Sequence, residues 1–430
     1  MFDQPVLGQL ALGYSPIIDR QRAVVATRLT LFPERTDAPL DVAALMQALQ
    51  EVWPAPAEPA DLRLTLRPLQ PQAAREAAAG RPAAPALTPV SLNVAGEALL
   101  NAVMRAPPAP HLMLEVPAFM ATEPAHAAAL QQLRAAGAVL LIKGRPVVPV
   151  APEVLACFSH ALVDAAEDRR GAAAPAPGVR QVSTVQAGVR TADEAEAAFQ
   201  RGAVAVLGWP FDDPLPAAAA RSKVATDIQV VMELIQGVDR EEPVQRLEAV
   251  LKRDPTLALR LLRYLNSPAF GLSAEVTSFG HAIMMLGYGR LKRWLALLLA
   301  SSSKGANAKP LLFAAVRRGL MMEELGRAQS DTEMRGEMFI CGVFSLLDKL
   351  LQQPFADLLK SVPVPERVRQ TLLGDEPADG PFGPYLELVR AIESESVFDI
   401  REWSERLLLG PAEVNRALLA ALRQAQQLEG

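Results

Sequence analysis

The side chains best placed for chemistry stand directly after short apolar runs in the first half of the chain. Asn93, Glu115 and Lys143 each follow such a run, and the amide of Gln186 follows a later one. The set holds one carboxylate, one amine and two amides, whereas a hydrolytic site with two divalent cations needs several oxygen ligands around each ion. No histidine and no second acid stands at an equivalent position, so this is a poor catalytic set.

The remaining candidate residues are isolated. His281 is the single histidine of the second half and lies near an expected helix start, where a lone histidine is more often structural than a ligand. Cys157 and Cys341 lie far apart in apolar surroundings, which predicts reduced thiols. Basic pairs such as Arg317-Arg318 have no interleaved aromatic residues, so they indicate solvated faces and argue against nucleic-acid binding.

The elements that position the first set of residues alternate between strands and helices. A β-hairpin is expected over 14–32 and a helix over 41–53. From Val90 onward, apolar β-rich runs alternate with helical patterns of 10–15 residues, which predicts a parallel sheet closed into a TIM-like barrel, regular or distorted. The expected strands are SLNV, LMLEV, AVLLIKG, VLACFS, RQVSTVQ and AVAVLGW, and HALVDAAEDRR is expected to be the helix after VLACFS.

The second half has helical patterns throughout. In 254–300, Asp254-Pro255 begins a helix with a leucine every fourth residue, which ends before the loop NSPAFGL. A second helix is expected to stop at Gly287, and a third follows it. Further amphipathic helices are expected up to the last residues, with EMFICGVFSLLDKLLQQ forming one of them, so the second half is expected to be all-helical.

Length, charge and hydropathy exclude several classes of protein. A chain of 430 residues is long enough for two or three domains, and its formal net charge of −5 argues against a nucleic-acid binder. The longest uninterrupted apolar run, WLALLLA, is far shorter than the roughly 20 residues of a membrane span, and the N-terminus does not resemble a signal peptide. We therefore expect a soluble, cytoplasmic protein.

Two family resemblances cover nearly the whole chain. NSPAFGL after ALRLLRYL, followed by AIMMLGYGRLKRW, resembles the HDOD domain, with Asn266, Ser267, Pro268, Phe270 and Gly271 as its signature residues. YSPIIDRQRAVVATRLTLF, SLNV, MLEV and VLGWPFDDP fall in the order of strands in the EAL domain, the barrel of cyclic-di-GMP phosphodiesterases. The resemblance implies an EAL-like domain over 1–216 followed by an HDOD domain over 222–430.

Carried over residue by residue, the EAL resemblance implies that few metal ligands remain. Arg28 stands in place of the glutamate of the EAL triplet, whereas Asn93 and Glu115 match an asparagine and a glutamate ligand. Lys143 stands in place of the first of two paired aspartates. The other ligand positions of the family fall at Gly144, Ala156, Phe158, Ala187, Arg190 and Leu207.

These replacements predict a site without metals. Two retained ligands cannot hold a pair of divalent ions, and Arg28 and Lys143 place positive charge where the metals would lie. We therefore expect no cofactor and no phosphodiesterase activity, with Arg28 or Lys143 paired to Glu115. The HDOD resemblance implies a similar loss, because Ser345-Leu346 stands in place of the His-Asp doublet of HD phosphohydrolases and Asp348 stands alone.

Three functions remain open. The leading hypothesis is a non-catalytic bacterial signalling protein that acts through contact with another signalling protein or a second copy of itself, with Pro268–Ser273 as one expected contact surface. The alternative is a receptor that binds cyclic-di-GMP or another anionic nucleotide at the barrel mouth, through Arg28, Lys143 and Arg190, without hydrolysing it. An active phosphodiesterase is the third and least favoured hypothesis.

Overall fold

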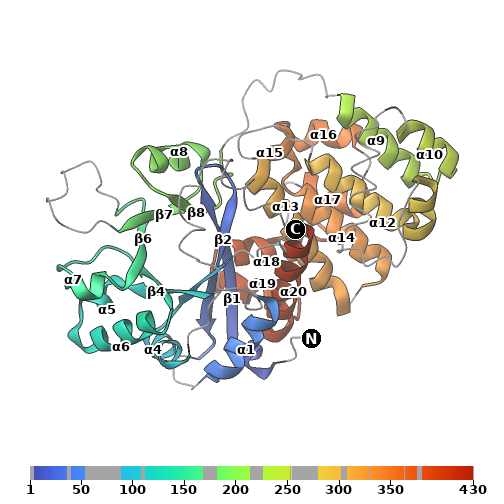
Figure 1. The fold of residues 1–430 in the computed structure, drawn as a ribbon. Coiled ribbons are helices and arrows are strands. Elements are labelled where there is room, and N and C mark those ends of the chain that lie inside the picture. Colours follow the sequence, from blue (N-terminus) through green and yellow to red (C-terminus); the bar gives the residue numbers. More distant parts are fainter. Residues whose placement is uncertain are drawn as a thin grey trace. The chain divides into compact units, whose positions relative to one another are not determined.

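The protein was analysed in a computed structural model, shown as a ribbon in Figure 1. The structure describes residues 4–35, 40–53, 89–107, 112–167, 182–213, 226–251, 253, 279–301, 308–328, 330–362, 364–374 and 380–429. It divides into two compact units. Met1–Asp213 and Ala391–Arg416 belong to the first, and Pro214–Arg390 and Ala417–Glu429 belong to the second.

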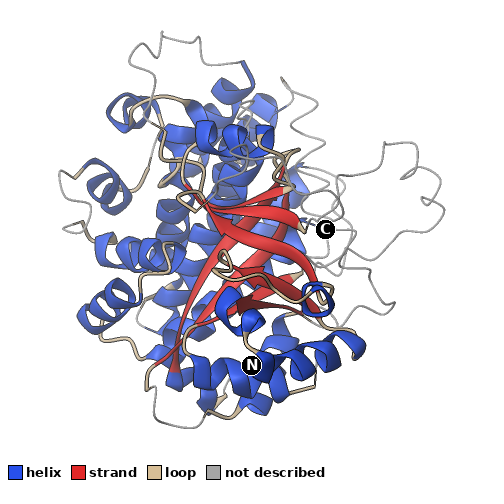
Figure 2. Cartoon of the chain, turned by 90° about the vertical axis from the view of Figure 1, so that its left-hand side faces the viewer, coloured by secondary structure: helices blue, strands red, loops and turns tan. Residues whose placement is uncertain are grey.

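The first unit is built on a closed barrel of eight described strands, in the order β1 to β8 (Figure 2). β1 and β2 form the expected antiparallel hairpin, the strands from β2 to β8 run parallel, and β1 closes the barrel antiparallel to β8. The barrel predicted from the sequence is therefore confirmed. The strands are β1 Leu10–Asp19, β2 Val24–Pro33, β3 Val90–Val94, β4 Leu112–Pro117, β5 Val139–Lys143, β6 Phe158–Asp164, β7 Ser183–Val189 and β8 Ala205–Gly208.

Helices connect the strands and begin where the sequence supplies capping groups. Asp41 accepts a hydrogen bond from the backbone N–H of Ala44 at the start of α1, and Thr191 and Glu194 form a capping box at the start of α8. The helical elements of this unit are η1 Pro5–Gln9, α1 Val42–Val52, α4 Glu97–Arg105, α5 Ala118–Thr122, α6 Pro124–Ala135, α7 Pro152–Leu155, α8 Ala192–Gln200 and α19 Val397–Arg406.

The sixth strand differs from the expectation. VLACFS was predicted as a strand and HALVDAAEDRR as a helix, but Pro152–Leu155 is a short helix and Phe158–Asp164 is the strand. The alternation of burial explains the difference, because Phe158, His160 and Leu162 are buried while the residues between them are partly exposed. The strand therefore begins several residues later in the sequence than predicted.

The barrel interior has an apolar part and a polar part. Ile17, Ala26, Met113, Leu141 and Val185 belong to one buried hydrophobic cluster contributed by many of the strands. Polar side chains replace apolar ones toward the carboxyl ends of β3, β4 and β5, the end of such barrels where functional sites are built. The apolar cluster thus supports a polar layer above it.

A segment from near the C-terminus, 391–416, completes this unit. The amide nitrogen of Asn415 donates hydrogen bonds to the carbonyl oxygens of Leu7 and Leu10, at 2.7 and 2.8 Å. β1 is buried along its whole length, although one of its faces points away from the barrel interior. The sequence assigned 222–430 to one helical domain. The division at 216–222 stays a prediction, but the compact unit that contains the barrel includes 391–416 as well.

The second unit is all-helical in its described residues. The predicted stop at Gly287 is confirmed by a non-helical backbone at this residue within α12, with φ 71° and ψ 165°. The helix predicted over EMFICGVFSLLDKLLQQ is interrupted at Ser345-Leu346, which separates α14 from α15. Its helices are α9 Thr226–Asp239, α10 Val244–Leu251, α12 Phe279–Ser301, α13 Ala308–Leu325, η3 Gly326–Ala328, α14 Thr332–Phe344, α15 Leu347–Leu351, α16 Phe355–Ser361 and α17 Glu366–Leu373, and α18 Gly383–Glu393 and α20 Pro411–Glu429 contribute to both units.

In the described part of the chain, no helix has both the length and the hydropathy of a membrane span.

Candidate functional site

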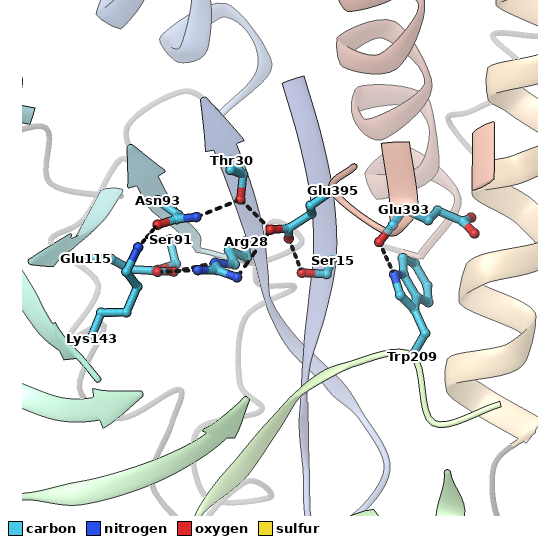
Figure 3. Close-up of polar contacts among 10 residues, drawn as sticks. All are labelled: Ser15, Arg28, Thr30, Ser91, Asn93, Glu115, Lys143, Trp209, Glu393 and Glu395. Carbon is cyan, nitrogen blue, oxygen red and sulfur yellow. Dashed lines mark hydrogen bonds and ion pairs between the residues drawn. The ribbon is translucent and has the colours of Figure 1, made fainter. Parts of the chain in front are cut away.

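The polar layer of the barrel is organised by the register of β2 and β3. Arg28 pairs with Ser91 and Thr30 pairs with Asn93 along the parallel ladder. Because alternate residues of a strand point to the same face, Arg28 and Thr30 share one face of β2, and it is the face that meets the polar side chains of the following strands. Figure 3 shows these side chains converging inside the barrel.

Arg28 and Glu115 form the centre of this layer. Arg28 donates from Nε to Oε1 of Glu115 at 3.0 Å and from Nη2 to Oε2 at 2.9 Å. Ser91 also donates to Oε1 of Glu115, at 2.9 Å. The Glu115 side chain is 0% exposed, so both of its oxygens are engaged in a site without access to water. The expected pairing of Glu115 with a cation is present, and Arg28 is the cation that makes it.

Lys143 takes a different partner. Its Nζ donates to Oδ1 of Asn93 at 2.6 Å, and Asn93 in turn donates from Nδ2 to Thr30 Oγ1 at 3.1 Å. Within the described residues Lys143 therefore has a hydrogen bond to a neutral amide and no ion pair. The lysine and the amide predicted from the sequence do lie together.

A carboxylate that the sequence analysis missed reaches this layer from the C-terminal segment. Glu395 accepts from Ser15 Oγ at 2.6 Å through Oε1, and from Thr30 Oγ1 at 2.7 Å and Arg28 Nη1 at 3.3 Å through Oε2. It stands in the turn between α18 and α19 with a φ of +56°, a conformation uncommon for glutamate. Figure 3 shows Glu395 beside β1 and β2, facing Ser15 and Arg28.

Burial and charge act in opposite directions on the two cations. Burial lowers the pKa of Arg28, but the charges of Glu115 and Glu395 and the hydrogen bond with Glu115 outweigh it, so its pKa is raised. The pKa of Lys143 is lowered, chiefly by burial, with the attraction of Glu115 opposing this effect and the positive charge of Arg28 adding to it. Arg28 therefore stays charged, whereas burial and the nearby charge of Arg28 both disfavour the charged form of Lys143.

Other positions predicted for the site lie apart from these contacts. Arg190 is largely exposed and pairs with Asp212 at 2.7 Å. Leu207 belongs to the apolar cluster of the barrel. The prediction that Ala156 and Phe158 mark the end of a strand is wrong, because β6 begins at Phe158.

The corrected strand changes which residues stand at the barrel edge. At the carboxyl end of β6 are Leu162, which is buried, and Asp164, which is exposed and accepts a hydrogen bond from the backbone N–H of Ala166. The prediction thus overlooked one carboxylate at this end. Asp164 is not part of a larger ligand set, since the described residues contain no group of three or more His, Cys, Asp or Glu side chains able to hold a metal ion.

The divalent ions implied by the EAL resemblance do not fit these side chains. Both oxygens of Glu115 accept hydrogen bonds from Arg28, and Oδ1 of Asn93 accepts one from Lys143. The donor atoms that a metal ion would need are therefore directed at fixed positive charges, which repel a cation.

In the helical unit, the position that the HDOD resemblance assigns to the His-Asp doublet is a hydrogen-bonded turn. Ser345 accepts from Arg318 Nη1 at 3.1 Å and donates to the carbonyl oxygen of Gly342 at 2.7 Å. Burial raises the pKa of Asp348, while Lys349 and Arg318 oppose this effect. The HDOD signature at Asn266–Gly271 and the contact surface expected at Pro268–Ser273 lie outside the described residues, as does the side chain of His281.

The residues missed by the sequence analysis had one weak signal. Ser15, Thr30, Ser91 and Glu395 are common residue types without a distinctive spacing. Gly13, however, lies inside β1, where a glycine often marks a close approach of another part of the chain. A Cβ at Gly13 would lie 3.1 Å from the Cα of Glu395, so this glycine makes room for the C-terminal turn.

Comparisons with known proteins agree with this architecture. The family model of the HDOD domain matches residues 224–357. The chain is 31% identical over 212 residues to a Bacillus subtilis (strain 168) protein named Uncharacterized protein YuxH. This match covers 48% of this chain and 50% of the relative. The chain is 25% identical over 241 residues to Cyclic di-GMP phosphodiesterase CdgJ of Vibrio cholerae serotype O1, covering 56% and 55%. The chain therefore spans about half the length of the curated relatives it matches.

Two solved structures match part of this chain, both with low TM-scores. PaMucR phosphodiesterase in complex with c-di-GMP has a TM-score of 0.27 at 18% identity, over 49% of this chain and 98% of that one. The EAL-like domain protein YdiV has a TM-score of 0.26 at 13% identity, over 48% and 94%. The chain thus has a closed eight-stranded barrel, and the HDOD family model matches a region of its helical part.

Proposed function

We propose that this protein is a non-catalytic member of cyclic-di-GMP signalling that acts through contact with other proteins. The observation that carries the proposal is the pairing of Arg28 with both oxygens of Glu115. A relative of this chain is named a cyclic di-GMP phosphodiesterase, and metal-assisted hydrolysis needs free carboxylate oxygens to hold its ions. In this chain the buried carboxylate at the barrel centre is already neutralised by an arginine.

The charges around Glu115 add to this argument. A divalent ion at this carboxylate would have to displace Arg28 and then remain close to both Arg28 and Lys143. The hydrogen bond from Lys143 to Asn93 also occupies the amide oxygen that would be a second ligand. Without a metal, this arrangement lacks the ion that activates water in metal-assisted hydrolysis, so the proposed output is binding. The same proposal places the protein in the cytoplasm, with its partner another signalling protein or a second copy of the chain.

Purified protein incubated with cyclic-di-GMP and Mg²⁺ or Mn²⁺ tests the absence of catalysis. We expect no linear dinucleotide above the level in buffer when the products are separated by chromatography. Turnover that is lost both in the presence of a chelator and in the Glu115→Gln variant would overturn the proposal. Turnover that persists in Glu115→Gln would instead point to a contaminating hydrolase, because the only buried carboxylate contributed by β4 would have been removed.

A second candidate function is a receptor for an anion. The observation that favours it is Lys143, whose described contacts include no acid in direct ion pairing. Calorimetry with cyclic-di-GMP separates the two candidates. Heat of binding that disappears in Lys143→Met would support a receptor, whereas no heat at high micromolar nucleotide would remove this alternative.

A further inference from the structure

Glu395 is held in the barrel as a bound carboxylate ligand would be. Its two oxygens are shared among Ser15, Thr30 and Arg28, at distances between 2.6 and 3.3 Å. The residues that hold it lie 365 to 380 positions earlier in the chain. Its side chain is 15% exposed, so the carboxylate is largely removed from water. Such placement requires compensating partners, which the two hydroxyls and the guanidinium provide.

The backbone around Glu395 shows that this position is specific. A glutamate with φ of +56° costs free energy that a glycine or asparagine would largely avoid. On the strand side, Gly13 leaves the space that Glu395 fills, since a Cβ there would lie 3.1 Å from both Cα and Cγ of Glu395. Local structure alone would therefore favour neither the glutamate at position 395 nor the glycine at position 13.

The charge balance of the site depends on this carboxylate. Arg28 and Lys143 contribute two positive charges and Glu115 contributes one negative charge. Glu395 brings the total to zero, and its attraction acts on the pKa values of both cations. Without Glu395, the same side chains would have an excess of one positive charge and two hydroxyl donors, a combination that suits a carboxylate.

The segment that carries Glu395 has its own attachments outside this site. Trp209 donates from Nε1 to the carbonyl oxygen of Glu393 at 2.7 Å, and Arg401 pairs with Glu34 at 3.2 Å. The segment continues at both ends into helices α18 and α20, whose other residues belong to the helical unit. The turn at Glu395 is thus one part of a segment held at several points, and its neighbours can be altered without touching the site.

We propose that Glu395 is an internal occupant of a carboxylate-binding site, and that segment 391–416 is a latch whose release opens this site to an acidic segment of a partner protein. The inference rests on the proposed function, because it assigns the barrel interior to binding, and it adds the chemistry of the partner. The closed latch excludes the partner. In the closed protein the apparent affinity for any external carboxylate is reduced by the small fraction of molecules in which Glu395 has left.

The experiment compares wild type with Glu395→Ala, using two probes. Acetate tests a small carboxylate, and a synthetic peptide with the sequence of residues 391–400, AIESESVFDI, tests an acidic segment. We expect Glu395→Ala to melt at a lower temperature than wild type and to recover part of the loss in acetate but not in chloride. The peptide should bind the variant at least about tenfold more tightly than wild type. Recovery with acetate but no preference for the peptide would reject the acidic-segment partner.

Glu34→Ala is the matched control, because it removes an attachment of the same segment at Arg401 without entering the site. Its melting temperature should respond equally to acetate and chloride. If Glu395→Ala fails to fold, Glu395→Gln keeps the shape of the side chain and should bind the peptide more tightly than wild type. Equal melting temperatures of wild type and Glu395→Ala, or equal peptide affinities, would overturn the latch. Metal-dependent hydrolysis by either protein would instead overturn the proposed function, and with it the basis of the latch, whatever the peptide affinities are.

Discussion

Arg28 and Glu115 meet through two parallel hydrogen bonds inside the barrel, with Nε and Nη2 of the arginine 3.0 and 2.9 Å from the two carboxylate oxygens. Planar, two-pronged pairing of this kind is the strongest arrangement that an arginine and a carboxylate can adopt. The pair still cost desolvation energy to bury, so it contributes little over a well-packed apolar pair. Removing only one of the two partners is much more destabilising, because the charge of the other partner stays buried without compensation.

Replacing Glu115 with alanine should therefore destabilise the barrel strongly. We expect the free energy of unfolding to fall by about 3–5 kcal/mol, since Arg28 would keep only its contact with Glu395. Chemical denaturation measures this change. The control is Glu196→Ala, which removes a 58% exposed partner of Arg22 and should cost no more than about 1 kcal/mol. A melting temperature of Glu115→Ala equal to that of wild type would refute the structural importance of the pair.

Asn415→Asp should separate the C-terminal segment from β1. Asn415 is 1% exposed and donates two hydrogen bonds to backbone carbonyl oxygens, whereas an aspartate would face them with a negative charge. We expect a loss of about 3 kcal/mol or more at neutral pH, because a buried charge would lack donors. Asn101→Asp, on a half-buried position of α4, is the comparison and should be mild. Equal effects of the two substitutions on urea unfolding would contradict this account.

In the helical unit, Gly342 and Gly336 provide a test within one helix. A Cβ at Gly342 would lie 2.6 Å from backbone atoms of Arg318 and Gly319, so α13 and α14 could not stay as close. Gly342→Ala should therefore cost about 3 kcal/mol. A Cβ at Gly336 would have no neighbour within 4 Å. Gly336→Ala should be neutral or stabilise by up to about 1 kcal/mol through helix propensity, and thermal unfolding that ranks the two variants the other way would refute this packing.

His160 should make the barrel sensitive to acid. Burial lowers its pKa to about 4 from 6.5, so between these values the unfolded chain binds a proton that the folded chain does not. Stability is therefore complete above pH 6.5 and decreases as the pH falls toward 4, by roughly 3 kcal/mol in total. His160→Gln should flatten this part of the stability profile measured by denaturation at several pH values.

The barrel was predictable because its signal is repeated along the chain. The runs that form β3, β4 and β7 are each followed by a helical pattern, and alternation of this kind has few structural solutions. β6 was misplaced because HALVDAAEDRR is rich in helix formers, whereas the buried positions at His160 and Leu162 follow the period of a strand. At β6, burial in the folded barrel therefore outweighs the local preference of the sequence for a helix.

The site was predictable only in part, for a different reason. Glu115 and Lys143 stand near the carboxyl ends of β4 and β5, which a parallel barrel must bring together, whereas Arg28 lies within β2 and was indicated only by the family resemblance. Glu395 lies far along the chain, after a helix, and nothing in the residues around it indicates that it reaches β1. The sequence also left Arg28 and Lys143 as equal candidates for Glu115. The strand register favours Arg28. It pairs with Ser91 along the β2–β3 ladder, and both residues donate hydrogen bonds to Glu115.

The return of segment 391–416 to β1 has a consequence for protein synthesis. At roughly 5–20 residues per second, a ribosome needs on the order of 10–35 s to make the residues between the end of β8 and this segment. During that interval Leu7 of η1 and Leu10 of β1 lack their hydrogen bonds to Asn415, and Arg28 lacks Glu395. The barrel strands are therefore synthesised first, but the barrel unit is completed only after the ribosome has made the helical residues that lie between β8 and segment 391–416.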